Sequence, residues 1–248
     1  MANAIDPHVP TPPPGEDELP CSFGEPMESD RHRKQMYLLI EALELAWCDR
    51  DDVHIGGDMA IYFSETQTKK NDFRGPDVFV VLDTVRRERK SWVVWQEDGR
   101  TPDVVIELLS ASTEHVDRGE KMRIYAKFLH VSEYYLFDPM TALLEGYELN
   151  PRAGGYNPIA VLPGGDLPCS RLGLRLGVRR GLYSGIETDW LRWIGEDGRV
   201  FPVGQELAAD AERLRAGAEQ RLADAEQRLA DALAEIERLK NAASKSGD

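Results

Sequence analysis

An acidic residue stands inside an apolar strand. In TPDVVIELLSAST, residues 101–113, Glu107 lies in a run of Val, Ile and Leu that is typical of a strand buried on both faces. Burying an ionised carboxylate without a partner costs a large amount of free energy. Two explanations are open for Glu107: a structural carboxylate paired with an arginine, or a carboxylate that binds a metal ion.

A second acid, Asp77, opens another apolar strand in GPDVFVVLD. If this strand neighbours the strand of Glu107, the two carboxylates meet, and a shared divalent cation with oxygen ligands relieves their repulsion. Such a metal can activate water and neutralise charge on a phosphate. Asp77 and Glu107 are therefore candidate metal ligands. Asp103 points to the same face as Glu107 and is either a further ligand or a turn residue at the start of its strand.

The third candidate is a cation. A helix predicted over residues 116–131 contains Lys121 and Tyr125, which are four residues apart and so share one face. With Tyr125 packed in the core, the helix can direct Lys121 towards the strand ends. A lysine beside a phosphate can steady an attacking water or a developing negative charge.

Other polar residues are weaker candidates. Glu41 and Glu44 on the first helix can approach the site, but solvent-facing helix acids are the more common case. The basic segment 86–90, with Arg86, Arg87, Arg89 and Lys90, precedes two tryptophans. It either contacts a phosphate backbone or forms a solvated hairpin turn, and the turn is the more common case.

The elements that must position these residues form a mixed α+β domain over residues 29–200. A helix capped by Ser29 or Asp30 runs to about Trp47. Strands are predicted at 53–63, 76–83, 91–96, 102–110, 133–139 and 142–149, the last two forming a hairpin, with further short strands and turns over 156–185. Residues 1–28, rich in Pro and acids, and residues 242–248 are predicted to be disordered tails.

Residues 205–241 are predicted to form a separate element, a coiled-coil helix. Apolar residues recur at spacings of three and four from Leu207 to Leu239, with one extra four-residue step between Leu214 and Leu222. Alanine occupies four of these ten positions, so the coil is thin. The alternatives are a solvated single helix and a homodimer that pairs through this segment, and we expect the homodimer.

Composition limits the function classes. The net charge is −14, and residues 1–30 hold seven acidic residues and no Lys or Arg, so the acidity lies disproportionately in the tails and nucleic-acid binding stays open. The sequence contains no apolar run long enough for a transmembrane helix and no pattern of a secretory signal. Its three widely separated cysteines fit neither a zinc site nor a disulfide framework, so a cytoplasmic protein is expected.

The segments GPDVFVVLD, SWVVWQEDGRTPDVVIELLSAST and DRGEKMRIYAKFLHVSEYYLFDP resemble the Uma2 family of endonucleases, also called DUF820, within the PD-(D/E)XK nuclease superfamily. The resemblance covers about residues 30–200. It implies a restriction-endonuclease-like core, a Mg²⁺ or Mn²⁺ cofactor, and hydrolysis of nucleic acid, with DNA as the expected substrate.

The resemblance also implies roles for single residues. Asp77 matches the aspartate of the superfamily's PD motif and Glu107 the second acidic ligand. The superfamily lysine normally stands two residues after that acid, where this chain has Leu109, so Lys121 on the following helix is the matching residue. The alternative function is a nuclease-like fold that has lost catalysis and acts as a binding or assembly module through its coiled coil.

Overall fold

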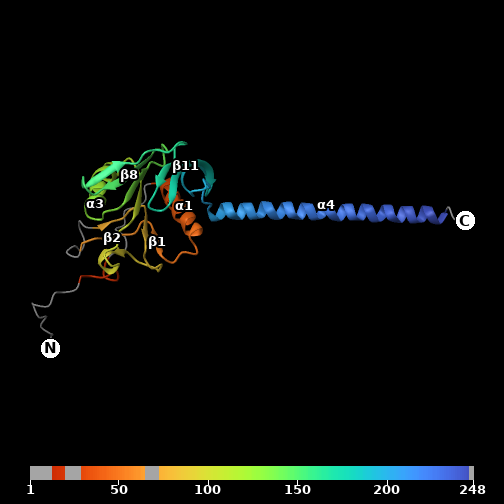
Figure 1. Cartoon of the computed structure of the whole chain (residues 1–248), viewed down its shortest axis with the longest axis horizontal. Coiled ribbons are helices and arrows are strands. Elements are labelled where there is room, and N and C mark those ends of the chain that lie inside the picture. The colour runs from red at the N-terminus through yellow and green to blue at the C-terminus, as the bar shows by residue number, and fades with distance from the viewer. Residues whose placement is uncertain (1–12, 20–28, 65–72, 246–248) are drawn as a thin grey trace, which may run out of the picture. The chain divides into compact units, whose positions relative to one another are not determined.

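The computed structural model describes residues 13–19, 29–64 and 73–245, with side chains up to residue 240. The chain divides into two compact units, residues 1–202 and 203–248. The first unit has a mixed α/β fold, as the sequence predicts, and the second contains one long helix (Figure 1).

A six-stranded mixed sheet organises the first unit. The strand order is β1-β4-β6-β7-β8-β9, and β6 and β7 are its parallel pair whereas the other neighbours are antiparallel. The predicted hairpin of the strands at 133–139 and 142–149 is present as β7 and β8. The strands of this sheet are β1 (Val53–Gly56), β4 (Val78–Leu82), β6 (Val104–Leu108), β7 (Glu133–Phe137), β8 (Leu144–Asn150) and β9 (Gly155–Pro158).

Two three-stranded sheets complete the described strands of this unit. One has the order β3-β2-β5 and the other the antiparallel order β10-β11-β12. Their strands are β2 (Ile61–Tyr62), β3 (Phe73–Arg74), β5 (Trp92–Val93), β10 (Leu167–Cys169), β11 (Leu174–Tyr183) and β12 (Ile186–Ile194).

Helix α1 (Asp30–Ala46) begins where the sequence predicts, because the Ser29 side chain accepts a hydrogen bond from the His32 backbone N–H. The helix is fixed to β12 by polar contacts in the interior. The buried Gln35 side chain exchanges two hydrogen bonds with the backbone of Leu191, at 2.9 and 3.0 Å. These contacts leave α1 in a defined position beside the main sheet.

The crossover between the parallel strands β6 and β7 is helical, as such connections usually are. It consists of α2 (Glu114–Val116), a π-helical turn η2 (Asp117–Lys121) and α3 (Met122–Lys127). The predicted single helix over 116–131 is therefore wrong in its bounds and its regularity. A π-helical turn widens the helix locally and is found frequently at functional sites.

Two predicted strands are also shorter than expected. The segment 53–63 divides into β1 and β2 because the chain bends at Asp58, whose φ is 49°. The segment 91–96 contains the two-residue β5 followed by a 3₁₀ turn, η1 (Val94–Gln96). Gly57 has a clear reason to be glycine, since a Cβ there would lie 2.4 Å from the backbone oxygen of Asp77.

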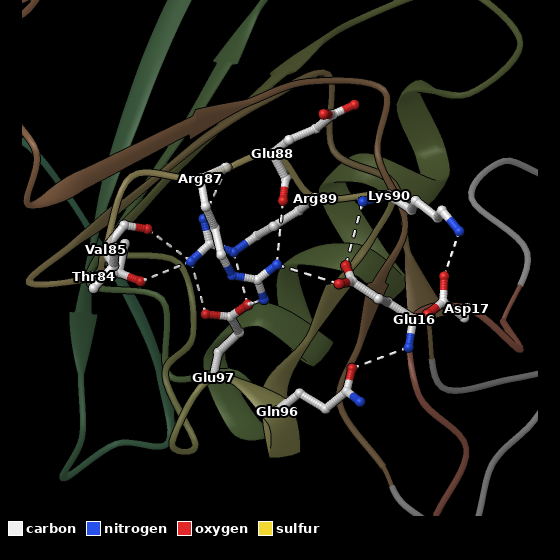
Figure 2. A network of polar contacts seen from close by, with 10 residues as sticks. All are labelled: Glu16, Asp17, Thr84, Val85, Arg87, Glu88, Arg89, Lys90, Gln96 and Glu97. Atoms are coloured by element: carbon white, nitrogen blue, oxygen red, sulfur yellow. Dashed lines mark hydrogen bonds and ion pairs between the residues drawn. The ribbon is translucent and has the colours of Figure 1, made fainter.

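The predicted disordered tail is wrong for residues 13–19. Leu19 is buried against Ala60, Tyr62 and Val93, and Glu16 and Asp17 bind the basic segment 86–90 (Figure 2). Residues 1–12, 20–28 and 246–248 of the predicted tails lie outside the described residues. The prediction is wrong for residues 242–245, which belong to the helix α4 (Gly204–Lys245).

The basic segment 86–90 belongs to an internal ion-pair network. The Arg89 side chain is fully buried and donates to both carboxylate oxygens of Glu97, at 2.7 and 2.9 Å, while Arg87 binds Glu97 and Glu16 (Figure 2). For Arg89 both expectations, a phosphate contact and a solvated turn, are wrong. The reason is that its acid partner Glu97, in the turn that follows η1, is itself buried, so the Arg89–Glu97 ion pair lies in the interior.

The second unit contains α4 (Gly204–Lys245). All the apolar seam residues from Leu207 to Leu239 are exposed in the single chain, for example Leu222 and Leu229 at 61% each. Within the part of the chain that the structure describes, no helix combines the length and the apolar character that crossing a membrane requires.

A buried histidine predicts an acid-sensitive element of the fold. His54 on β1 stacks on Trp92, with ring centroids 5.2 Å apart, and lies 9% exposed with its Nε2 atom lacking a hydrogen-bond partner. Burial, together with the nearby Arg89 cation, lowers the pKa of His54 from 6.5 to about 4. The unfolded chain therefore binds a proton between pH 6.5 and 4 that the folded chain does not bind.

We expect His54→Phe to reduce the loss of stability on acidification. The wild type should lose on the order of 3 kcal/mol more than the variant between pH 7.5 and 4, because only the wild type carries this protonation difference. Urea unfolding of both proteins across this pH range measures the difference. Parallel curves for the two proteins would contradict the assignment.

Candidate active site

The two candidate acids come together because their strands are neighbours. Strand β4 pairs antiparallel with β6, and Val78 lies opposite Ile106. Asp77, one residue before Val78, thus meets Glu107, one residue after Ile106. The Asp77 backbone N–H lies 3.4 Å from Glu107 Oε2, and Asp77 Oδ2 accepts a 2.7 Å hydrogen bond from the Leu108 N–H. The predicted adjacency of the two strands is confirmed.

Glu107 is fully buried and both of its oxygens have partners. Oε1 accepts a 2.7 Å hydrogen bond from the Tyr125 hydroxyl, and Oε2 lies 3.0 Å from Lys121 Nζ. Lys121 and Tyr125 are four residues apart, so the crossover helix presents both to one carboxylate. Of the two initial explanations, the pairing with an arginine is wrong: the partner is a lysine.

Lys121 reaches Glu107 from the crossover helix, and strand β6 has no lysine two residues after the acid. Leu109, at the position two residues after the acid, is 5% exposed and packs in the core with Tyr125. Lys121 Nζ also lies 2.8 Å from Asp117 Oδ1, within the π-helical turn. The ammonium therefore bridges two buried carboxylates, while 20% of its side chain stays exposed to solvent.

Asp77 is held by the first helix as well as by the sheet. His32 Nε2 lies 2.8 Å from Asp77 Oδ1. On the other side, the backbone N–H of Asp58 donates to the carbonyl of Pro76, which places the Gly57–Asp58 turn against Asp77. The Asp77 side chain is 18% exposed, so solvent reaches the cluster through Asp77 and Lys121.

Burial and mutual repulsion raise the pKa values of several acids in the cluster. Burial raises the pKa of Glu107 to about 8, against the opposing effect of Lys121, and the nearby Asp77 and Asp117 raise it further. Burial also raises the pKa of Asp117, and burial together with Asp77 raises that of Asp58. Burial opposes the charge of Lys121, but the carboxylates outweigh it and hold the pKa of Lys121 above its usual value. The site therefore has more acids than cations.

Asp103 does not join this cluster. Its Oδ2 accepts a 2.7 Å hydrogen bond from the Leu82 N–H, and its Oδ1 pairs with Arg171 at 2.7 Å. Both contacts fix the far end of the β4–β6 pair, because Asp103 stands four residues before Glu107 on the same strand. The structure thus gives Asp103 the contacts of a residue that secures the start of β6.

Sequence reasoning missed three members of the cluster, namely His32, Asp58 and Asp117. His32 gives no signal, because its contact with Asp77 joins residues 45 positions apart. Asp117 was within reach, since it stands four residues before Lys121 on one helix. The two acids of the first helix, Glu41 and Glu44, have contacts elsewhere. Glu41 accepts a hydrogen bond from Tyr183, and Glu44 lines a surface pocket beside His54.

The model of the Uma2 family, described as "Putative restriction endonuclease", matches residues 23–182. The chain belongs to the Uma2 family. The matched range contains every residue of the buried cluster around Glu107, namely His32, Asp58, Asp77, Glu107, Asp117, Lys121 and Tyr125.

Two individual proteins are similar to this Uma2 chain. The uncharacterized protein slr1290 of Synechocystis sp. is 32% identical over 103 residues, which are 41% of this chain and 49% of that protein, so the chain spans about half the length of this curated relative. A crystal structure of "a putative nuclease belonging to DUF820" from Anabaena variabilis is similar with a TM-score of 0.41 and 15% identity, over 57% of this chain and 75% of that chain.

The buried Glu107 carboxylate should cost stability in the metal-free protein. We expect Glu107→Gln to raise the free energy of unfolding on the order of 2–5 kcal/mol near pH 8, because the folded state disfavours the ionised form. The gain should shrink as the pH falls and vanish below about 4, because Glu107 then becomes protonated in the unfolded chain as well. Urea unfolding in EDTA at several pH values measures this gain.

The control for this prediction is Glu133→Gln on the neighbouring strand. The buried Glu133 accepts hydrogen bonds from the Arg171 N–H and the Tyr135 hydroxyl, so its loss should lower stability. A lower stability of Glu107→Gln at pH 8 would show that Glu107 acts as a structural ion pair.

Proposed function

We propose that the chain is a Mg²⁺-dependent endonuclease that hydrolyses phosphodiester bonds of nucleic acid, with DNA as its substrate. The observation that supports this most is the meeting of Asp77, Glu107 and Lys121 at one solvent-reachable position. These residues come from three elements, β6, the crossover helix and the start of β4. Membership of the Uma2 family agrees with this proposal.

The residues fit a hard divalent cation. The cluster offers carboxylate oxygens, and its acids have pKa values raised by burial and mutual repulsion, which a cation would relieve. Among the described residues, no group of three or more His, Cys, Asp or Glu side chains has the geometry of a metal site. Mg²⁺ does not need such a group, because it usually binds one or two carboxylates and keeps several waters.

In this proposal Asp77 and Glu107 hold the cation, which when bound activates water and neutralises charge on the phosphate. Tyr125 fixes the orientation of Glu107, and His32 fixes that of Asp77. Lys121 orients the nucleophilic water and stabilises the negative charge that develops as the water oxygen attacks phosphorus. The P–O ester bond to the leaving oxygen then breaks; the attacking water releases one proton to solvent, and the leaving oxygen takes up one proton from solvent.

Plasmid cleavage with Mg²⁺ tests the enzyme. We expect Asp77→Asn, Glu107→Ala and Lys121→Met each to reduce the rate at least about 100-fold, because each removes a group that acts on the reacting atoms. EDTA should abolish cleavage. Asp103→Asn is the matched control, an acid of the same strand outside the cluster, and should keep most of the activity. Equal cleavage by wild type and Glu107→Ala would reject the site.

The alternative is a nuclease-like fold that works as a binding or assembly module through α4. The full set of protein partners around Glu107 is the observation that favours it, because the carboxylate is satisfied without a metal. Calorimetry with Mn²⁺ separates the two functions. The endonuclease should bind Mn²⁺ and lose this binding on Asp77→Ala, whereas the module should bind none.

We further propose that α4 pairs with α4 of a second copy, which makes the protein a homodimer. The seam holds Leu222, Leu229 and Ile236 at equivalent positions seven residues apart, all of them about half exposed or more in the single chain. Burying such a seam is what drives coiled-coil pairing. Pairing with a second copy would remove the exposed apolar stripe of this 42-residue helix from water.

Charge favours a parallel pair in register. With Leu222 and Leu229 at the first position of their heptads, Arg221 and Glu235 flank the seam on one side and Glu226 and Lys240 on the other. In a parallel dimer Arg221 faces Glu226 of the second copy, and Glu235 faces Lys240 of the second copy. Both contacts join opposite charges, so this arrangement specifies its own partner.

A charge swap tests the dimer. We expect Arg221→Glu and Glu226→Arg each to weaken dimerisation of the full chain by about 0.5–2 kcal/mol, because two like-charged contacts form per dimer. The double variant should recover the wild-type affinity. Asp231→Arg, on the outer face of α4, should have no effect. Sedimentation equilibrium measures all four proteins, and a monomeric wild type would end the proposal.

A further inference from the structure

A pocket of about 440 Å³ lies beside the candidate active site. Its lining combines aromatic and charged side chains from three segments, the end of β2, the short β3 and the crossover helix. Phe128 is 58% exposed, and its ring centroid lies 6.3 Å from that of Phe63. The residues on which the inference rests are Phe63, Arg74, Glu120, Arg123 and Phe128.

The chain connects this pocket directly to the catalytic cluster. Glu120 precedes Lys121, and Arg74 stands three residues before Asp77, a span of at most about 11 Å. Arg74 and Glu120 form an ion pair of 2.5 Å, which joins the two segments between the pocket and the cluster. A ligand in the pocket is therefore adjacent to any phosphate at Asp77, Glu107 and Lys121.

Two exposed side chains of the pocket, Phe128 and Arg123, are of the types that contact single-stranded nucleic acid, and the exposed acid Glu120 is paired with Arg74. Phe128 offers an open aromatic face, and the exposed Arg123 stands on the same helix. Aromatic faces stack on unpaired bases, while arginine and lysine contact the backbone phosphates. The exposed Lys127 adds a second cation next to Phe128. This cationic and aromatic surface contrasts with the acidic cluster beside it.

We propose that this pocket binds one unpaired nucleotide next to the phosphate that is cut. Its base stacks on Phe128 and its phosphate lies against Arg123. A base inside a duplex is stacked on both faces by its neighbours and cannot reach Phe128, so the substrate carries a single-stranded stretch at this point. The assignment of the neighbouring phosphate rests on the proposed nuclease function, but the binding of the nucleotide can be measured without cleavage.

Fluorescence anisotropy with a labelled twelve-nucleotide single strand tests the pocket, with EDTA present so that no cleavage occurs. We expect the full-length wild type to bind the single strand more tightly than a duplex of the same sequence. Phe128→Ala should weaken single-strand binding about ten-fold, and Phe128→Tyr should restore it, because tyrosine keeps the stacking face. Arg123→Ala should weaken binding and reduce its dependence on salt.

The matched control is Tyr37→Ala. Tyr37 on α1 is another exposed aromatic residue with an arginine beside it, Arg33, whose guanidinium carbon lies 5.7 Å from the ring centroid. This variant should bind within two-fold of the wild type. Equal single-strand affinity of Phe128→Ala and the wild type, or preference of the wild type for the duplex, overturns the inference. Neither result bears on plasmid cleavage, which tests the nuclease proposal separately.

Discussion

The burial of the Glu107 charge is the constraint on which the site depends. A carboxylate in the centre of a sheet loses its hydration, and the fold returns only part of this through the Tyr125 hydroxyl and the Lys121 ammonium. Asp77 and Asp117 then add charge of the same sign nearby, which raises the pKa of Glu107 further. A core selected for stability alone would carry Val or Leu at this position. The four acids around one lysine and one histidine are the charges that the proposed cation would compensate.

The crossover between β6 and β7 makes this arrangement possible. A parallel strand pair requires a helical connection over one face of the sheet, and here that connection lies over the face to which Glu107 points. The π-helical turn at Asp117–Lys121 lets Asp117 and Lys121 pair within it while Tyr125, one turn later, remains in the core. The lysine thus comes from the helix, and Leu109 on the strand is free to pack in the hydrophobic core. One element therefore supplies both the cation of the cluster and the cover of the sheet.

The sequence predicted the parts of the site that follow from local pattern. The continuous apolar run of β6 singled out Glu107, the Pro-Asp start of β4 placed Asp77, and helical spacing placed Lys121 and Tyr125 on one face. The contacts that it could not predict join residues far apart in the chain. His32 meets Asp77 across 45 positions, and Arg171 meets Asp103 across 68, and neither pair has a spacing rule that would single it out. The π-helical turn was also beyond prediction, because its residues favour an ordinary helix and tertiary contacts decide the difference.

The distribution of charge reconciles an acidic protein with a nucleic-acid partner. The basic segment 86–90 is the densest run of cations in the first unit, yet Glu97 occupies Arg89 from inside the fold, and Glu16 and Asp17 bind Arg87 and Lys90 from the N-terminal segment (Figure 2). The ion pairs of these cations hold residues 13–19 and the turn after η1 in place. The exposed cations of the crossover helix, Arg123 and Lys127, stand instead on the element that carries Lys121. Under the proposed function, the net charge of −14 would repel a phosphate backbone at long range, and the exposed Arg123 and Lys127 would attract it within about one Debye length. Binding then depends on the position of a few cations beside the acids, and the total charge of the chain does not decide it.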